Sequence, residues 1–168
     1  ARTNLEKLRQ TAPQWYPLAA YLSGKGFDLY RNTALRYLPT GEAYLEDMLT
    51  TLDTAQRFIF LEYFIMAEGE IWDRLSDILC RKSRQGVEVK LIFDDFGSMM
   101  RMPNEKIDAL QDAGVEVRVF NPVHHYVNRL YFNYRDHRKI TCVDGDIAYT
   151  GGANIADEYA NLIERFGY

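Results

Sequence analysis

The amino-acid sequence predicts a layered α/β domain, in which a mostly parallel, mixed β-sheet is flanked by helices. Apolar segments of strand length alternate with amphipathic helical segments from residue 45 to residue 120. Two of the strands begin alike, because Gly86-Val-Glu-Val and Gly114-Val-Glu-Val each place a glycine helix stop before an alternating run. Strand, helix, strand, helix, strand is the order typical of a largely parallel sheet.

The start of the chain differs from the rest. The first thirty residues are rich in leucine and tyrosine and contain one of the two tryptophans of the chain. We expect a helical lead-in over residues 1–39 and one main domain over residues 40–168. That domain opens with a helix, because four apolar residues at helical spacing form one face: Leu45, Met48, Leu49 and Leu52.

The next elements alternate between strand and helix. Residues 57–66 are dense in Phe, Ile and Tyr, which indicates a buried strand. A helix from about Glu70 has basic residues in its last turn and stops at Gly86. A shorter helix, begun by Asn104, joins the two strands that begin alike.

The last elements form a strand pair. Residues 138–143 are expected to be a strand, Asp144-Gly145 a tight turn, and residues 147–150 the returning strand. Gly151-Gly152 then leads into a final helix near Asn154.

Composition limits the classes of protein that fit. With 168 residues, 47% of them hydrophobic, the chain is the size of one domain and can bury a core. A net charge of -4 does not favour a nucleic-acid partner. There is no signal-peptide pattern, and no apolar run approaches the length that spans a bilayer.

The two cysteines and the two chain ends support further expectations. Cys80 and Cys142 lie in apolar-periodic segments, which favours two small buried thiols in a reducing compartment over a disulfide. The sequence starts at Ala1 without Met and stops at Tyr168 just after a helical pattern. We therefore expect a piece of a longer protein.

A histidine and a lysine are the predicted reactive residues. His137 and Lys139 are two residues apart at the start of a predicted strand, so their side chains share a face and place an imidazole beside a fixed positive charge. Asp144 is seven residues after His137, which puts it on the opposite face and in the turn. We interpret it as a residue that fixes the turn and supports the site from behind.

The glycines suggest a phosphate site. Backbone N–H groups of Gly151 and Gly152, at the start of the expected helix, would be open to a phosphate oxygen, and Asn154 would cap the helix or donate its amide to the same oxygen. His137 would then be the nucleophile, and the other groups would stabilise charge on a phosphoryl group.

Three acidic residues stand out in strands. Glu62 lies within an apolar strand, so its carboxylate needs a partner, either in a structural ion pair or in orienting a catalytic group. Asp94 and Asp95 end a strand, where they cap a loop or face a ligand crevice, and we favour capping. No histidine or third carboxylate has a matching spacing, so we expect neither a metal nor a cofactor.

The long loop from residue 121 to residue 135 mixes aromatic and basic side chains. Such a mixture suits a lipid headgroup or another polyanion, although for any single residue a packed loop with solvated charges is the slightly favoured explanation. The residues concerned are Tyr126, Arg129, Tyr131, Phe132, Tyr134, Arg135 and Arg138.

These motifs resemble the phospholipase D superfamily, and more closely its bacterial cardiolipin synthases. The family's HKD histidine, lysine and aspartate fall on His137, Lys139 and Asp144. Its glycine-rich anchor and asparagine fall on Gly151, Gly152 and Asn154, with glycine where many members of the superfamily have serine. The resemblance runs from about Thr40 to Tyr159 through the segments Phe60-Leu-Glu-Tyr-Phe-Ile, Phe93-Asp-Asp-Phe-Gly-Ser, Asn133-Tyr-Arg-Asp-His-Arg-Lys-Ile and Thr150-Gly-Gly-Ala-Asn-Ile-Ala-Asp-Glu-Tyr.

The resemblance implies a metal-independent phosphatidyltransferase that works in two steps. One histidine forms a phosphohistidine, and a second histidine, from a second copy of the motif, protonates the leaving alcohol and activates the acceptor. His124 and His125 lack the lysine and aspartate spacing, so the second half-site would come from a missing C-terminal half or from a second chain. The predicted reaction joins two phosphatidylglycerol molecules into cardiolipin and releases glycerol, with Glu62, Arg135 and Arg138 helping to bind the anionic substrate.

Two alternatives remain open. One is a phosphodiesterase or nuclease of the same superfamily that is completed by dimerisation. The other is a catalytically incomplete half domain that binds a phosphate or a partner. For the parent protein the resemblance implies the bacterial cytoplasmic membrane and a lipid surface as partner, with this piece itself soluble.

Overall fold

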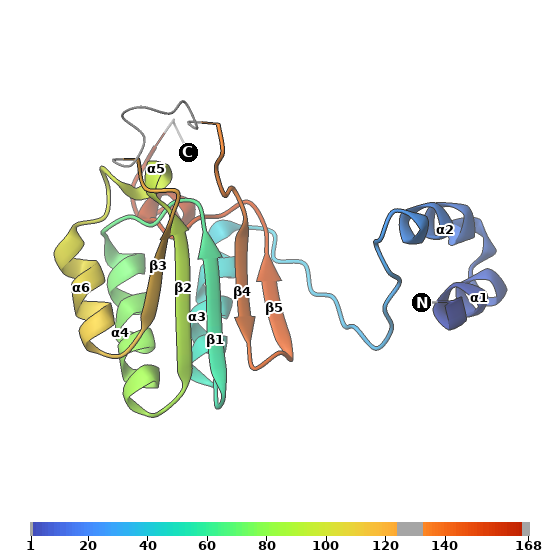
Figure 1. Ribbon diagram of the computed structural model, residues 1–168, viewed down its shortest axis with the longest axis horizontal. Coiled ribbons are helices and arrows are strands. Elements are labelled where there is room, and N and C mark those ends of the chain that lie inside the picture. Colours follow the sequence, from blue (N-terminus) through green and yellow to red (C-terminus); the bar gives the residue numbers. More distant parts are fainter. Residues whose placement is uncertain (1, 124–132, 166–168) are drawn as a thin grey trace. The chain divides into compact units, whose positions relative to one another are not determined.

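The computed structural model describes residues 2–123 and 133–165 (Figure 1). The chain divides into two compact units, Ala1–Tyr37 and Leu38–Tyr168. The first unit contains helices α1 (Arg2–Thr11), η1 (Pro13–Trp15, a 3-10 helix) and α2 (Tyr16–Gly24). The predicted boundary after residue 39 lies close to this division.

The second unit is built on a five-stranded sheet in the order β3-β2-β1-β4-β5. β1 runs parallel to β2 and β2 parallel to β3, whereas β4 is antiparallel to β1 and β5 to β4. The predicted α/β class is thereby confirmed, with the parallel part confined to three strands. The strands are β1 (Phe58–Tyr63), β2 (Glu88–Asp94), β3 (Glu116–Phe120), β4 (Lys139–Val143) and β5 (Ile147–Thr150).

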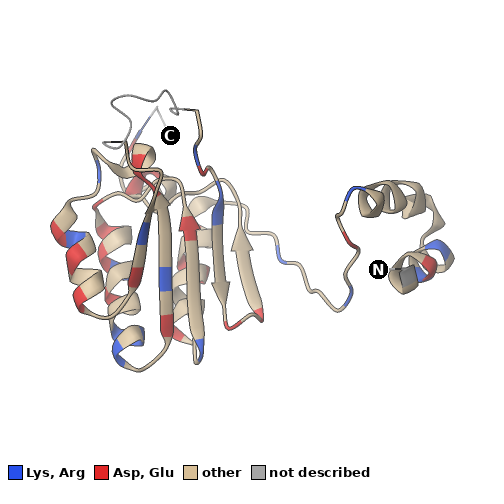
Figure 2. Cartoon of the chain, viewed as in Figure 1, with Lys and Arg blue, Asp and Glu red and all other residues tan. Residues whose placement is uncertain are grey.

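Helices lie behind the sheet in Figure 1 and bury one of its faces. Along β1 the side chains alternate, so that Ile59, Leu61 and Tyr63 are buried in the core while Phe58 and Phe60 stay half-buried. Acidic and basic residues are frequent along these helices (Figure 2). The helices are α3 (Gly41–Asp53), α4 (Glu70–Arg84), α5 (Asp95–Ser98) and α6 (Asn104–Asp112).

The two cysteines are free thiols, in agreement with the expectation, but both are only half-buried. Cys142 belongs to the half-exposed positions of β4, because its neighbours Thr141 and Val143 take the core face of the strand.

The predicted helix near Asn154 is wrong. Ile155 instead pairs in parallel with Met66, and it exchanges backbone hydrogen bonds with Ile65 (3.2 Å) and Ala67 (2.9 Å). A 3-10 helix, η3 (Asp157–Ala160), follows, and no α-helix begins between it and residue 165. Pairing with the segment after β1 therefore overrides the local helical tendency.

Asp157 has a structural role at the start of α4. Its carboxylate accepts hydrogen bonds from the backbone N–H groups of Glu70 and Ile71, each at 2.9 Å. Gly69, with φ at 156°, leaves room for this carboxylate, where a Cβ would collide with it. An acidic residue from another part of the chain thus caps the helix.

We predict that Asp157→Ala lowers the free energy of unfolding by about 1–2 kcal/mol, the usual effect of losing a helix cap. Urea unfolding followed by circular dichroism measures this change. Asp108→Ala, at an exposed position on α6, is the control and should leave the midpoint unchanged. Equal midpoints for the two variants would contradict the capping role.

Candidate active site

His137 lies just before β4 and is exposed. Its ring contacts the ring of Phe64, with the centroids 4.7 Å apart and the planes at 57°. Phe64 follows β1 directly, and Tyr63 is opposite Lys139 in the β1–β4 register. The imidazole therefore has one side against an aromatic ring while its residue remains open to solvent.

Lys139, the first residue of β4, reaches the same aromatic ring from a buried position. Its ammonium Nζ lies 5.3 Å from the centre of the Phe64 ring and donates a hydrogen bond of 2.7 Å to the carbonyl of His137. The residue is only 4% exposed. Burial lowers the pKa of the Lys139 ammonium below its ordinary value of 10.5, and the Asp136 carboxylate opposes that shift.

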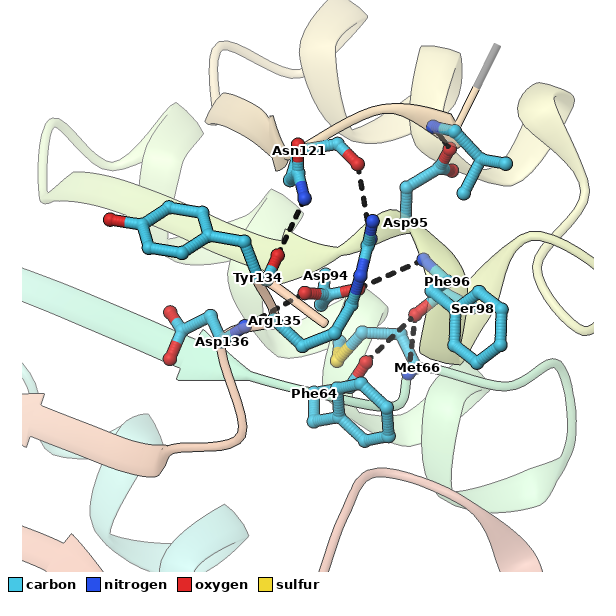
Figure 3. Close-up of polar contacts among 11 residues, drawn as sticks. Phe64, Met66, Asp94, Asp95, Phe96, Ser98, Asn121, Tyr134, Arg135 and Asp136 are labelled. Carbon is cyan, nitrogen blue, oxygen red and sulfur yellow. Dashed lines mark hydrogen bonds and ion pairs between the residues drawn. The ribbon is translucent and has the colours of Figure 1, made fainter. Parts of the chain in front are cut away.

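Phe64 is held in place by neighbouring segments. Ser98 donates a hydrogen bond to the carbonyl of Phe64 (3.4 Å) and accepts one from the N–H of Met66 (3.0 Å), as Figure 3 shows. Gly97 allows this approach, because a Cβ there would collide with the Phe64 carbonyl. Phe64 was not predicted as a site residue, although it lies in one of the segments that resemble the family.

Asn154 supports the same segment. Its carbonyl Oδ1 accepts a hydrogen bond from the N–H of Ile65 (3.0 Å), and its amide Nδ2 donates to the hydroxyl of Tyr159 (2.8 Å). The residue is 2% exposed. Both ends of the amide are thus engaged inside the protein, and Asn154 reaches the site through the backbone next to Phe64.

The two glycines differ from expectation in their setting. Gly151 and Gly152 are exposed with open space around them, as a phosphate contact requires. However, no α-helix begins after them in residues 133–165, so a helix dipole does not contribute there. Any contact with phosphate would depend on their backbone N–H groups alone.

Asp144 holds the start of β1. Its carboxylate accepts hydrogen bonds from the backbone N–H groups of Gln56 (2.9 Å), Arg57 (2.7 Å) and Phe58 (2.8 Å). These donors, Gln56 first, hold the pKa of Asp144 below its ordinary value of 3.8. The turn position is special too, because Asp144 has φ at 56°. The geometry agrees with the interpretation of Asp144 as a turn-fixing residue.

Glu62 forms an ion pair, which compensates the partial burial of its carboxylate. Nη1 of Arg138 lies 2.9 Å from the carboxylate of Glu62. Burial, and then the neighbouring Asp136 carboxyl, raise the pKa of Glu62 above 4.5, while Arg138 opposes this rise. Asp136, which is buried one residue before His137, was not predicted as a site residue.

The remaining predicted residues fall into two groups. Arg135 is largely buried and pairs with Asp94 at 3.1 Å, while Tyr134 is exposed. Tyr126, Arg129, Tyr131 and Phe132 lie outside the described residues, as do His124 and His125.

Within residues 2–123 and 133–165, no group of three or more His, Cys, Asp or Glu is placed to hold a metal ion. In the same part of the chain, no helix has the length and apolar character needed to cross a membrane.

Comparison with known families identifies the chain. Residues 48–163 match the family described as "Cardiolipin synthase, PLD-like domain". A fold with one His-x-Lys motif next to a central strand pair fits this assignment, and the chain belongs to this family.

Several relatives are similar along most of the chain. An uncharacterized protein of Streptococcus mutans is 43% identical over 165 residues, which is 98% of this chain and 36% of that protein. Cardiolipin synthases of Oceanobacillus iheyensis and Geobacillus kaustophilus are 37% and 38% identical, over 89% and 94% of this chain and 29% and 31% of theirs. The chain therefore spans about a third of the length of these relatives.

Solved structures share the fold. Nuc from Salmonella typhimurium, a phospholipase D family member, matches with a TM-score of 0.51 at 20% identity, over 68% of this chain and 66% of that one. NucT from Helicobacter pylori matches with a TM-score of 0.53 at 13% identity, over 71% and 72%.

The contacts of Asp144 predict a pH-dependent stability. Because its pKa is lowered on folding, its charged form stabilises the protein above pH 3.8, and this contribution is lost as pH falls through the lowered value. Asp144→Asn should therefore lower the Tm at pH 7, and its deficit relative to the unmodified protein should shrink below pH 3.8.

Thermal unfolding across this pH range measures the effect. Asp146→Asn, in the same turn but exposed, is the matched control and should change the Tm little at any pH. A deficit for Asp144→Asn that stays constant down to about pH 2 would contradict the role assigned to its charge.

Proposed function

We propose that this chain supplies one of two HKD half-sites in a phosphatidyltransferase that makes cardiolipin and glycerol from two phosphatidylglycerol molecules. The observation that carries the proposal is the meeting of His137 and Lys139 on the ring of Phe64, within a fold of the cardiolipin synthase family. A nucleophile and a fixed cation next to each other suit attack on a phosphodiester.

In the first step, an imidazole nitrogen of His137 attacks the phosphorus of one phosphatidylglycerol. A P–N bond forms, and the P–O bond to the glycerol headgroup breaks. A second histidine, from the other half-site, protonates the departing glycerol oxygen. This step leaves a phosphatidyl group on His137.

In the second step, that second histidine removes the proton from a hydroxyl group of another phosphatidylglycerol. The hydroxyl oxygen attacks phosphorus, the P–N bond breaks, and cardiolipin is released. Both histidines return to their starting protonation states, so the proposed cycle closes without a cofactor or a metal.

Lys139 is proposed to stabilise charge on the phosphoryl oxygens. Its ammonium is removed from water, and its hydrogen bond to the His137 carbonyl fixes its position relative to the nucleophile. A charge held in a site of low dielectric costs no reorganisation during the reaction, which makes it effective at the transition state.

An anionic membrane surface is the proposed partner of the full-length enzyme. Residues 1–37 contain six Lys or Arg and two Asp or Glu, while the whole chain carries a net charge of -4 (Figure 2). Trp15, Tyr21 and Phe27 are exposed in this unit. Aromatic and basic side chains together suit the headgroup region of a bilayer.

We expect His137→Ala to remove nearly all transfer in the full-length enzyme, because no other group forms the covalent intermediate. Lys139→Met should lower turnover on the order of a hundredfold to a thousandfold while leaving the Tm unchanged or higher, because it replaces a buried cation with an apolar chain of similar length. Turnover of phosphatidylglycerol vesicles and thermal unfolding are measured together.

The products distinguish the reaction classes. Cardiolipin and glycerol support transfer, whereas phosphatidic acid and glycerol would favour a phosphodiesterase. Full turnover by His137→Ala would remove the basis of the proposal.

A second prediction concerns the chain by itself. Because one histidine cannot act efficiently as both nucleophile and proton donor, the purified 168-residue chain should show little or no transfer compared with the full-length enzyme. Turnover equal to the full-length enzyme in a sample shown to be monomeric by light scattering would contradict the half-site proposal.

A further inference from the structure

Asp94 is a buried acidic residue at the end of a strand. It is the last residue of β2, next to the central strand, and is opposite Phe120 of β3 in the sheet register. Its side chain is completely buried. A buried carboxylate is costly unless hydrogen bonds compensate it, so the contacts of Asp94 show where that compensation comes from.

The contacts of Asp94 are directed at the segment before His137 (Figure 3). Its Oδ2 accepts a hydrogen bond of 2.8 Å from the N–H of Asp136. Its Oδ1 accepts one of 2.9 Å from the N–H of Phe96 and one of 3.1 Å from Nη1 of Arg135. Oδ1 caps α5, at a place where capping of a loop was expected, whereas Oδ2 accepts the hydrogen bond from Asp136.

Arg135 strengthens this attachment. The same Nη1 also donates to the carbonyl of Asn121 at 3.1 Å, and the guanidinium lies 5.5 Å from the centre of the Phe96 ring. Asn121 in turn donates to the carbonyl of Tyr134 at 2.5 Å. Three consecutive residues before His137 are therefore tied to the ends of β2 and β3.

We propose that Asp94 is a positioning residue that fixes the backbone carrying His137 and so sets the orientation of the nucleophile. This inference rests on the proposed function of His137. The backbone N–H of Asp136 donates a hydrogen bond to Asp94, and the ring of the next residue, His137, contacts Phe64. Hydrogen bonds to a buried charge are stronger than neutral ones, which suits a fixed attachment.

Positioning predicts a particular kinetic effect. If His137 is displaced by a fraction of an ångström, the substrate still binds next to it. The imidazole and the phosphorus then reach the near-attack geometry less often. Asp94→Asn keeps the size of the side chain but loses an acceptor and the negative charge. We expect kcat in the full-length enzyme to fall about tenfold to a hundredfold, with KM changing less than about threefold.

A second readout does not depend on activity. Amide hydrogen exchange of the 168-residue chain, followed by NMR, should show exchange of the Asp136 and His137 amides rising about tenfold or more in Asp94→Asn. Amides inside the sheet, such as that of Leu91, should keep their protection. Asp95→Asn is the matched comparison, because Asp95 accepts from the N–H of Val123 at 2.6 Å, and it should raise exchange at Val123 instead.

Controls cover folding and activity. Asp108→Asn, at an exposed position on α6, should change neither kcat nor the exchange rates. If Asp94→Asn does not fold, Arg135→Lys tests the same attachment, since it keeps the charge but loses the planar group that reaches both Asp94 and Asn121. It should show the same fall in kcat and the same local rise in exchange.

The outcomes separate the inference from its alternatives. Unchanged exchange at Asp136 in a folded Asp94→Asn protein, or an unchanged kcat, would overturn the inference. Exchange that rises evenly over the whole sheet would also overturn it and indicate a general structural role. Activity in His137→Ala would contradict the proposed function, and the exchange data would still decide whether Asp94 holds the segment.

Discussion

The antiparallel pairing of β4 with β1 decides where every other part of the site can lie. Its register places Lys139 opposite Tyr63, and beyond this pair the ring of His137, two residues before Lys139, contacts the ring of Phe64. A buried network fixes this register: the hydroxyl of Tyr63 lies 2.8 Å from both Thr141 Oγ1 and the hydroxyl of Tyr44, and burial raises the pKa of Tyr63 well above 10.0. A slip of one residue would turn Lys139 away from the core and break these hydrogen bonds, because side chains alternate along a strand.

The motif residues divide into those that form the reactive surface and those that hold it. Asp144, Asn154 and Asp157 all direct their side-chain oxygens at backbone N–H groups of distant segments. The segments that they hold are the start of β1, the turn after it and the start of α4, which are places where the backbone lacks a regular hydrogen-bond partner. A compact polar side chain can satisfy two or three such donors at once, which explains why these positions carry Asp or Asn without touching His137.

Periodicity along the chain predicted the five strands and the helices α3, α4 and α6 of the main domain, because these depend on local geometry, whereas the four-residue α5 was not predicted. The helix expected near Asn154 failed because pairing of Ile155 with Met66 is a long-range contact. The roles of Phe64 and Asp94 were out of reach for the same reason, since each acts on residues more than forty positions away in the sequence. For Glu62 the sequence indicated that a partner was needed, but only the register of β1 against β4 identified Arg138.

The difference in exposure between the two reactive residues has a physical reason under the proposed function. A nucleophile that must meet a lipid phosphate and a second histidine needs one open side, and His137 has it, since Phe64 covers the other. A charge-stabilising cation has the opposite requirement, because water would weaken its field, and Lys139 is buried accordingly. Burial of Lys139 has a desolvation cost, which its lowered pKa reflects and which the nearby Asp136 carboxylate partly offsets. Asp136 therefore links the two requirements. Its carboxylate favours the charged form of Lys139, and its backbone N–H, which donates to Asp94, holds the chain next to the exposed His137.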